Sequence, residues 1–331
     1  MKGRSSLIKI GMGLLSLALC LGLTGWGGAQ EKYPTREITF ITGTQAGAGN
    51  DLIQRALCAR ASKILGQNVI VMNKPGAAQA LALVALKNAK ADGYTIGAIP
   101  SGAVGNQLMK KVSYDCLKDY TYFIQCTGLT HGIAVRAGAP WKTIQELMAH
   151  AKNNPGKLRM GIRGIGSAHH LAMERLSMKI GAKFIMTPFV GDVDALTNLL
   201  GGHVDAIFTN LTFLPQVEAG QVRLIALAGA GESRENWMAE FPKIPTLMET
   251  YGIDVPTFNG IGGPKGLPPR VVNTLHQAFK QAMGDRDFIE AAKKFSCPVI
   301  YLGPEDLTKE VHRTFYSIAE IVKKLGLQSK E

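Results

Sequence analysis

The sequence lacks the features that would place most of it in a membrane or on nucleic acid. After its first 29 residues, the 331-residue chain has no apolar run approaching the roughly 20 residues of a transmembrane helix, so we expect this part to be soluble. The net charge of +12 is spread along the sequence without a dense basic or basic-aromatic stripe. Nucleic-acid-binding proteins concentrate Lys and Arg in such stripes, so we expect no nucleic-acid partner. The mild positive charge suits an anionic ligand, but it equally suits an ordinary protein surface.

Motifs of covalent catalysis are also missing. Ser167 lacks the flanking glycines of a nucleophile elbow, because Ile165 and His169 occupy the outer positions. No paired-carboxylate motif stands out in the sequence. We therefore do not expect an enzyme.

A dinucleotide-binding motif is incomplete as well. Residues 47–49 read Gly-Ala-Gly, which resembles the start of a Rossmann fingerprint, but Leu52 stands where the third glycine belongs. The second predicted strand ends at Asn73, where that motif carries an acidic residue for the ribose. We expect no cofactor.

The histidines do not form a metal-binding pattern. His169 and His170 are adjacent, so on a helix their side chains point about 100° apart. His131 and His203 are isolated in the sequence. We interpret all four as surface or capping residues and expect no metal site.

None of the five cysteines lies in a CxxC pair, so their spacing does not favour zinc. Cys20 belongs to the amino-terminal segment discussed next. In an oxidising compartment, Cys58, Cys116, Cys126 and Cys297 could form up to two disulfides with three alternative pairings, or they could remain buried thiols. The sequence leaves this choice open.

The first 29 residues have the order of a secretory signal peptide. Three cations precede an uncharged run over residues 10–23, and small residues at 27–29 precede a polar segment. A membrane anchor is the alternative, but this run is about 14 residues long and a span needs about 20. We expect residues 1–29 to be a signal peptide and the mature protein to be periplasmic.

Strands and helices alternate along the rest of the chain. A strand is predicted over residues 37–41, followed by a glycine-rich loop and a helix over 51–65 with Leu52 and Ile53 on its apolar face. Further strands are predicted at 68–72, 94–99, 133–135, 158–162, 184–187, 206–208 and 224–228. Strands separated by helices need parallel pairing and right-handed crossovers, so the fold class is α/β.

The chain is long enough for two cores, because single domains usually contain about 100–200 residues. We predict two lobes, the first formed by residues 30–128 and 256–331 and the second by residues 129–255. The chain would cross between them near residues 127–130 and return near 256–262.

Two glycine-rich loops, one in each lobe, are the candidate ligand site. Gly47 and Gly49 allow close approach of the backbone, and the helix amides that follow favour an anion. Residues 164–169 repeat this arrangement in the other lobe, with Ser167 at the start of a helix. Each loop alone could be a plain turn with a helix cap. Together they predict that the two loops contact one anion from opposite sides, beyond the carboxyl ends of the strands.

These motifs agree, in order, with one family. They are Tyr33-Pro34, Ile38-Thr39-Phe40-Ile41, Ala46-Gly47-Ala48-Gly49-Asn50-Asp51, Arg55, Leu65-Gly66-Gln67, Asn73-Lys74-Pro75-Gly76-Ala77, Ala91-Asp92-Gly93-Tyr94-Thr95, Asn154-Pro155-Gly156-Lys157, Gly164-Ile165-Gly166-Ser167, Leu199-Leu200-Gly201-Gly202-His203-Val204-Asp205, Ala219-Gly220-Gln221-Val222-Arg223 and Gly263-Pro264-Lys265-Gly266-Leu267-Pro268. The sequence resembles the Bug-type receptors, the extracytoplasmic binding proteins of tripartite tricarboxylate transporters. The resemblance covers essentially the whole mature chain.

The resemblance implies a type II periplasmic-binding-protein fold with a hinge and an interlobe ligand cleft. It implies a small carboxylate ligand and the membrane permease subunits of such a transporter as partners, and we expect a monomer. The predicted ligand-binding residues are Thr44, Gln45, Ala46, Gly47, Gly49, Asn50, Asp51, Ser101, Gly166, Ser167, Ala168, His169, Phe189 and Asn210. We expect Ser167 and the amides around Gly49 and Ala168 to hold the carboxylate, and Asp51 to cap its helix and organise the loop.

Two departures from the family pattern bear on the ligand. Residues 43–44 are Gly-Thr where relatives often have Pro-Phe, and residues 188–191 are Pro-Phe-Val-Gly where they often have Pro-Tyr-Lys-Gly. Because the Tyr and Lys of the family pattern are missing, we expect the mouth of the ligand pocket to be less polar. Such a pocket favours a mono- or dicarboxylate, aromatic acids included, over a strongly acidic tricarboxylate. An exported hydrolase using the same cleft, or a ligand receptor for a signalling sensor, remains an alternative.

Overall fold

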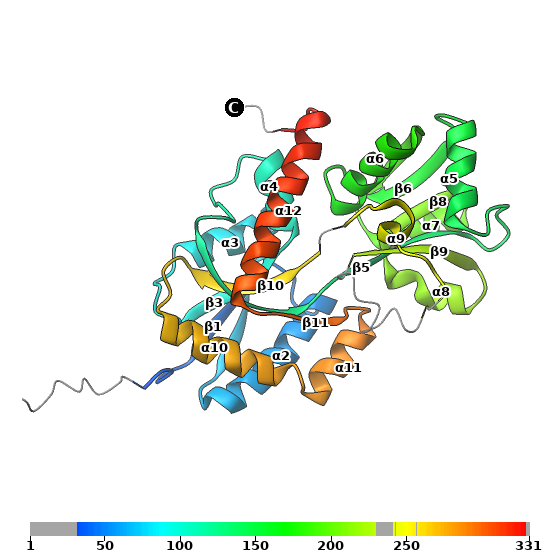
Figure 1. Ribbon diagram of the computed structural model, residues 1–331. Helices are drawn as coiled ribbons and strands as arrows, with labels where there is room; N and C mark the ends of the chain where they lie inside the picture. Colours follow the sequence, from blue (N-terminus) through cyan, green and yellow to red (C-terminus); the bar gives the residue numbers. More distant parts are fainter. Residues whose placement is uncertain (1–31, 230–240, 242, 256, 329–331) are drawn as a thin grey trace, which may run out of the picture. The chain divides into compact units, whose positions relative to one another are not determined.

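A computed structural model describes residues 32–229, 241, 243–255 and 257–328 (Figure 1). The predicted signal peptide and Cys20 lie outside the described residues. Across the described ranges, no helix combines the length and the apolar character needed to span a membrane.

Six strands form one mixed sheet in the order β11-β4-β10-β3-β1-β2. Their bounds are β1 Ile38–Thr42, β2 Val69–Asn73, β3 Thr95–Pro100, β4 Tyr120–Thr127, β10 Asn259–Pro264 and β11 Val299–Leu302. Strand β1 pairs in parallel with β2 and β3, as the strand–helix alternation predicts. Strand β10 is antiparallel to both β3 and β4, so a late segment of the chain completes a sheet that its first third begins.

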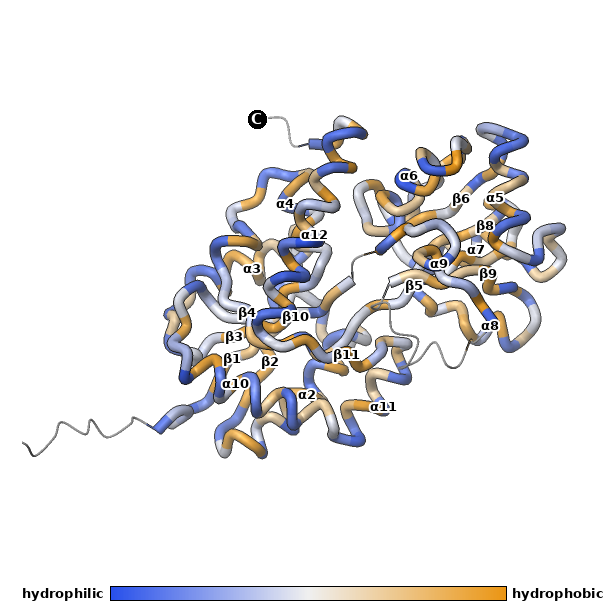
Figure 2. The backbone as a smooth tube through the Cα atoms, viewed as in Figure 1, coloured by the Kyte–Doolittle hydropathy of each residue, from blue (hydrophilic) through white to orange (hydrophobic). Residues whose placement is uncertain are grey.

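Six helices and one 3₁₀ turn belong to the same part of the chain. They are α2 Gly49–Leu65, η1 Ala77–Gln79, α3 Ala80–Lys87, α4 Gly102–Met109, α10 Pro269–Ala282, α11 Arg286–Lys294 and α12 Pro304–Lys324. Helix α2 packs against α10 and α11, and α12 packs against α4 and β4. Hydrophilic and hydrophobic segments alternate along α10 and α11 (Figure 2). Only the apolar face of such a helix is buried, as Leu275 and Phe279 are in α10.

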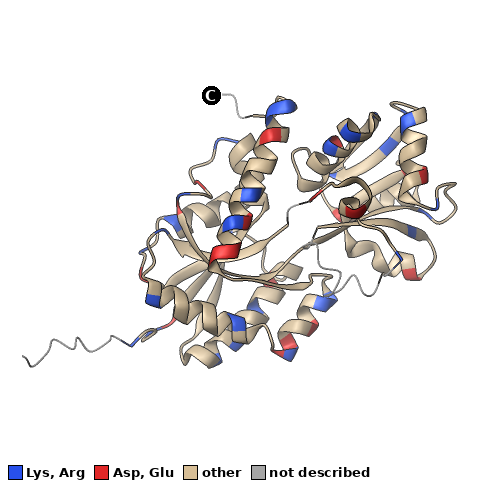
Figure 3. Ribbon diagram, viewed as in Figure 1, with Lys and Arg blue, Asp and Glu red and all other residues tan. Residues whose placement is uncertain are grey.

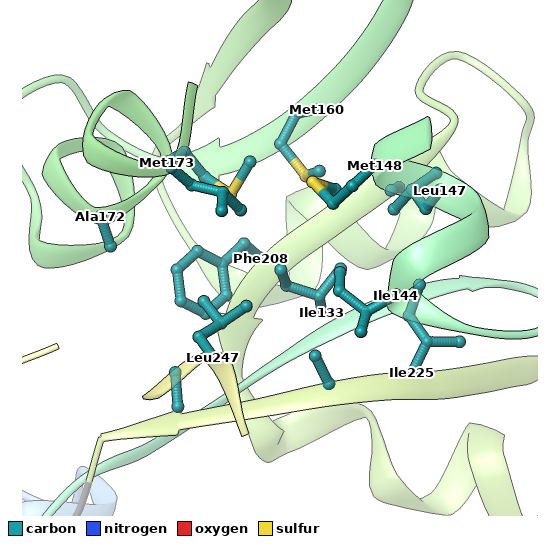
Figure 4. Close-up of a cluster of buried hydrophobic side chains, with 14 of the residues drawn as sticks. Ile133, Ile144, Leu147, Met148, Met160, Ala172, Met173, Phe208, Ile225 and Leu247 are labelled. Atoms are coloured by element: carbon teal, nitrogen blue, oxygen red, sulfur yellow. The ribbon is translucent and has the colours of Figure 1, made fainter. Parts of the chain in front are cut away.

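The second sheet has five strands in the order β7-β6-β8-β5-β9. The strands are β5 Thr130–Arg136, β6 Leu158–Arg163, β7 Phe184–Phe189, β8 Ala206–Asn210 and β9 Val222–Gly229. The accompanying helices are α5 Ile144–Asn153, α6 Ala168–Ile180, α7 Asp192–Leu200, η2 Leu211–Phe213, α8 Leu214–Glu218 and α9 Leu247–Tyr251. Phe208 of β8 lies at the centre of one core cluster, between Met173 of α6 and Ile133 of β5 (Figure 4).

The chain passes from the first sheet to the second through Gly128 and Leu129, directly between β4 and β5. The return segment leads from Val255 to β10. Thr257 of this segment donates from its hydroxyl to the Leu129 carbonyl at 2.9 Å, so the two connections are hydrogen-bonded to each other. Pro256, at one of the predicted lobe boundaries, lies outside the described residues.

Side-chain caps begin α5 and α9 of the part that carries the five-stranded sheet. Thr143 begins α5 and accepts from the Glu146 amide at 3.2 Å, but the Glu146 carboxylate accepts from the Lys142 amide instead of that of Thr143. A complete capping box occurs at Thr246 and Glu249, which the sequence analysis did not single out. The reciprocal bonds there satisfy two amides at the start of α9.

Two further expectations are decided by the structure. Leu52 was expected on the apolar face of its helix, but it is 40% exposed, because the buried face of α2 is formed by Ile53, Leu57 and Ala61 and Leu52 faces away from it. The four cysteines of the described chain are all free and buried, which decides the choice between disulfides and thiols.

Candidate functional site

A cavity of about 620 Å³ is lined by residues from both sheets and their connecting loops. The first part of the chain contributes Asn50 of α2, Ser101 before α4 and Asn106 within α4. The second part contributes His131 of β5 and Asn210 at the end of β8. A pocket of this volume accommodates a small organic ligand.

Half of the predicted ligand-binding residues meet at this cavity. Those that line it are Asn50, Ser101, Gly166, Ser167, Ala168, His169 and Asn210. Those that are not among its lining residues are Thr44, Gln45, Ala46, Gly47, Gly49, Asp51 and Phe189. The loop before α6 therefore lines the cavity directly, whereas of residues 44–51 only Asn50, in the first turn of α2, reaches it.

The carboxylate of Asp51 organises the first loop through hydrogen bonds. Its side chain is 1% exposed and accepts from the Gly47 amide at 2.8 Å, the Arg55 guanidinium at 2.9 Å and the Asn73 amide group at 2.7 Å. Burial alone would raise the pKa of the Asp51 carboxyl, but these hydrogen bonds outweigh it and hold the pKa below its ordinary value. The expected capping role is wrong, because Asp51 lies within α2 and the helix begins after Ala48. The expected loop-organising role is confirmed.

Ser167 combines a structural role with a place at the cavity. Its hydroxyl oxygen accepts from the His170 amide at 3.2 Å, which makes it the cap of α6. The loop before it requires glycine, because Gly164 and Gly166 have positive φ angles of 62° and 80°. A Cβ atom on Gly166 would also lie 2.6 Å from the Met109 sulfur. The Ser167 hydroxyl hydrogen remains available to a ligand oxygen.

His131 and His169 are buried against each other, so their assignment as surface or capping residues is wrong. They are 2% and 4% exposed, and His131 Nδ1 lies 2.9 Å from His169 Nε2. Burial lowers the pKa of His131 to about 4 and that of His169 well below its usual value. Both rings are therefore neutral at pH 7. His203 is exposed, as expected. His170 is buried, and its Nδ1 accepts from the Gly166 amide at 3.1 Å just before α6, which agrees with the expected capping role.

A chain of polar contacts continues from this pair. His131 Nδ1 also lies 2.9 Å from Asn210 Oδ1, and Asn210 Nδ2 donates to Asp192 Oδ2 at 2.8 Å. The other Asp192 oxygen is 4.0 Å from the guanidinium of Arg163. The network links the end of β8 to the starts of α6 and α7 and thereby fixes the orientation of the Asn210 amide.

The electrostatics of the cavity favour an anion. Lys110 and Arg163 line it, and no Asp or Glu is among the described residues of its wall. Helices α2, α4 and α6 all begin at the cavity. The first amides of a helix lack intrahelical partners, and they stabilise an anion by about 0.3–1 kcal/mol, or about 2 kcal/mol when partly buried. Elsewhere, along α11 and α12, Lys and Arg are interspersed with Asp and Glu (Figure 3).

The structure adds lining residues that the sequence analysis missed. Arg163 directly follows a predicted strand and could have been found from that position, because strand ends collect ligand-binding side chains. His131, Lys110 and Asn259 carried no such local signal. Among the described residues, no three His, Cys, Asp or Glu side chains are grouped so that they could hold a metal ion.

A sequence model of the family described as "Tripartite tricarboxylate transporter family receptor" matches residues 53–327, which is most of the chain. The chain belongs to this receptor family. A similar protein over the full length of this receptor is the "UPF0065 protein in gbd 5'region" of Cupriavidus necator. It is 36% identical over 328 residues, which cover 99% of each chain.

Two solved structures of the family are similar to this receptor. A TctC solute-binding protein from Polaromonas, without ligand, is 31% identical with a TM-score of 0.80, over 88% of this chain and 99% of that one. The periplasmic binding protein BugD is 28% identical with a TM-score of 0.69, over 90% of this chain and 100% of that one. These structures confirm the resemblance to Bug-type receptors and the two-lobe α/β fold. The family and these neighbours are solute-binding proteins, so this receptor is a binding protein and not an enzyme.

Proposed function

We propose that the protein is an exported receptor that captures a small mono- or dicarboxylate, aromatic acids included, and delivers it to the permease of a tripartite tricarboxylate transporter. The observation that carries this proposal is a single cavity whose wall has two cations, three helix starts and no described acidic side chain. Such a wall attracts an anion and repels a cation.

The proposed site has one loop from each half of the molecule. Ser167 and the amides at the starts of α6 and α2 hold the carboxylate, and Arg163 and Lys110 supply positive charge at the rim. Residues 30–128 with 256–331 form one lobe and residues 129–255 the other, and ligand binding favours their closed arrangement. The order of residues 1–29 supports export to the periplasm, and we propose a monomeric receptor.

A thermal-shift screen of carboxylates, followed by calorimetry, tests this function. We expect at least one mono- or dicarboxylate to bind, and an amine of the same carbon skeleton not to bind. Ser167→Ala should weaken carboxylate binding about 5- to 30-fold, because a lost hydrogen bond to a charged group is worth about 1–2 kcal/mol. A panel in which no carboxylate binds would refute the proposal.

Thr143→Ala is a matched control for the loss of a helix cap. Thr143 also begins a helix and also accepts an amide bond of 3.2 Å, but it does not line the cavity. We expect both variants to lose similar stability, about 0.5–2 kcal/mol, and only Ser167→Ala to lose affinity. Equal affinity of the two variants would remove Ser167 from the proposed site.

A further inference from the structure

Arg163 is a cation of the cavity wall whose hydrogen-bond donors are unused. It is the last residue of β6, and its side chain is 47% exposed, so a ligand in the cavity can reach it. The guanidinium makes no hydrogen bond to the described part of the protein. Its contact with Asp192 Oδ1 measures 4.0 Å, which is an ion pair but is too long for a hydrogen bond. All of its N–H groups therefore remain available to a ligand.

Arg163 and helix α6 lie on opposite faces of the five-stranded sheet, because successive side chains of a strand point to alternate faces. Ile162 of β6 belongs to the core cluster that contains Met173 of α6. A Cβ atom on Gly161 would lie 3.1 Å from the side chain of Ile207, which belongs to the other cluster, packed against α7. Arg163 follows Gly161 by two positions, so its side chain leaves the strand on the α7 face.

The start of α6 offers a separate position for an anion. Ser167 caps the third amide of this helix, that of His170. The first two amides, those of Ala168 and His169, make no hydrogen bond within the described chain. Ser167 and Ala168 both line the cavity that Arg163 lines. The end of β6 therefore lies between two positions that attract an anion, one on each face of the sheet.

We propose that the cavity has two carboxylate subsites, one at the start of α6 and a second at Arg163, so that this receptor prefers dicarboxylates to monocarboxylates. This inference rests on the proposed function and narrows it. The planar guanidinium presents parallel N–H groups that fit both oxygens of a carboxylate. The ion pair with Asp192 orients the guanidinium without occupying those donors. A cavity of about 620 Å³ has room for a ligand that reaches both positions.

Matched acids in which a second carboxylate replaces the terminal methyl group test this subsite by calorimetry. The pairs are butyrate and succinate, pentanoate and glutarate, and hexanoate and adipate, and the series also varies the separation of the two carboxylates. We expect the dicarboxylate of at least one pair to bind about 10-fold more tightly or better, because a hydrogen bond between charged groups contributes that much. If the dicarboxylate gains less than about threefold in every pair that binds, the second subsite is refuted while the proposed function stands. If no carboxylate binds, the proposed function itself fails.

Three variants then assign the preference to Arg163. Arg163→Gln changes a half-exposed side chain that makes no hydrogen bond in the described structure, so we expect it to fold and to bind both members of a pair within about threefold of each other. Arg163→Lys keeps the charge but loses the planar pair of donors, and it should give an intermediate preference. Lys110→Gln is the matched control, because Lys110 is an exposed cation of the same cavity wall in the other half of the molecule. It should keep most of the preference for the dicarboxylate.

Two results would overturn the assignment. An Arg163→Gln protein with the wild-type preference would show that the second carboxylate lies elsewhere. An equal loss of preference in Arg163→Gln and Lys110→Gln would show that the positive charge of the cavity acts as a whole, without a subsite at Arg163.

A measurement on the wild-type protein does not depend on the folding of any variant. The monomethyl ester of the preferred dicarboxylate keeps both carbonyl groups and the chain between them, but it lacks the second charge. We expect the half-ester to lose about 10-fold in affinity or more, because the neutral ester forms a weaker hydrogen bond with a guanidinium than a carboxylate does. A half-ester that binds as tightly as the diacid would refute a second carboxylate subsite.

Discussion

Mild acidification should destabilise the ligand-free receptor through its buried histidines. The folded-state pKa of His131 is about 4, whereas an unfolded histidine titrates near 6.5. Between these values the unfolded chain binds a proton that the folded chain does not. The contribution of His131 to the free energy of unfolding is therefore fully present above about pH 6.5 and is lost as the pH falls toward 4.

The pKa difference sets the size of the effect. At pH 5, proton binding by the unfolded state stabilises it by about 2 kcal/mol relative to pH 7.5 for His131 alone. For a chain of this length, that corresponds to a fall in Tm of about 3 °C. The lowered pKa of His169 has the same sign and adds to the fall. The carboxyls of Asp51 and Asp205 also have lowered pKa values, but they lose stability only below about pH 4.

Thermal unfolding followed by circular dichroism at pH 7.5 and pH 5.0 measures this difference. His131→Gln should have a lower Tm at both pH values because it disturbs the polar network, but its loss between them should be about 3 °C smaller than that of the wild type. His203→Gln, a change at an exposed position, should keep the wild-type loss. If the wild type and His131→Gln lost the same number of degrees, a buried neutral His131 would be excluded.

Three substitutions test other features by urea unfolding. Gly132→Ala should lose about 1–3 kcal/mol, because its Cβ would lie 2.6 Å from the side chains of Leu211 and Leu224; an unchanged midpoint would refute this tight packing. Phe208→Ala should lose about 3–5 kcal/mol from the centre of its core, and a loss under 1 kcal/mol would contradict its burial. Asp51→Asn should lower the free energy of unfolding by about 1–3 kcal/mol, because it weakens the hydrogen bonds that organise the first loop. A variant more stable than the wild type would show that the buried charge of Asp51 destabilises the folded protein.

The strand–loop–helix pattern and both glycine-rich loops could be predicted because their signals are local. The predicted strand over residues 37–41 matches β1, and the loop before Ser167 precedes a helix as expected. Periodicity, helix caps and glycine all act over a few residues. The sequence therefore located the loops that precede α2 and α6, but it did not predict α4, the third helix that begins at the cavity.

The histidine network could not be predicted because it depends on contacts between distant segments. His131 and His169 are 38 positions apart, and His131 and Asn210 are 79 apart. Taken singly, neither histidine carries a signal in the sequence that marks it as the partner of the other. Only the pairing of β5 with β8, which places His131 opposite Asn210, makes them neighbours.

The distribution of the four buried thiols makes them a reporter for one half of the molecule. Cys58, Cys116, Cys126 and Cys297 all belong to the part of the chain that builds the six-stranded sheet. Burial raises the pKa of each thiol, to about 12 for Cys116 and about 11 for Cys297, and only the thiolate reacts. A thiol-directed dye will therefore label the native protein slowly, and its uptake will time the opening of this half alone, because the five-stranded half contains no sulfhydryl group.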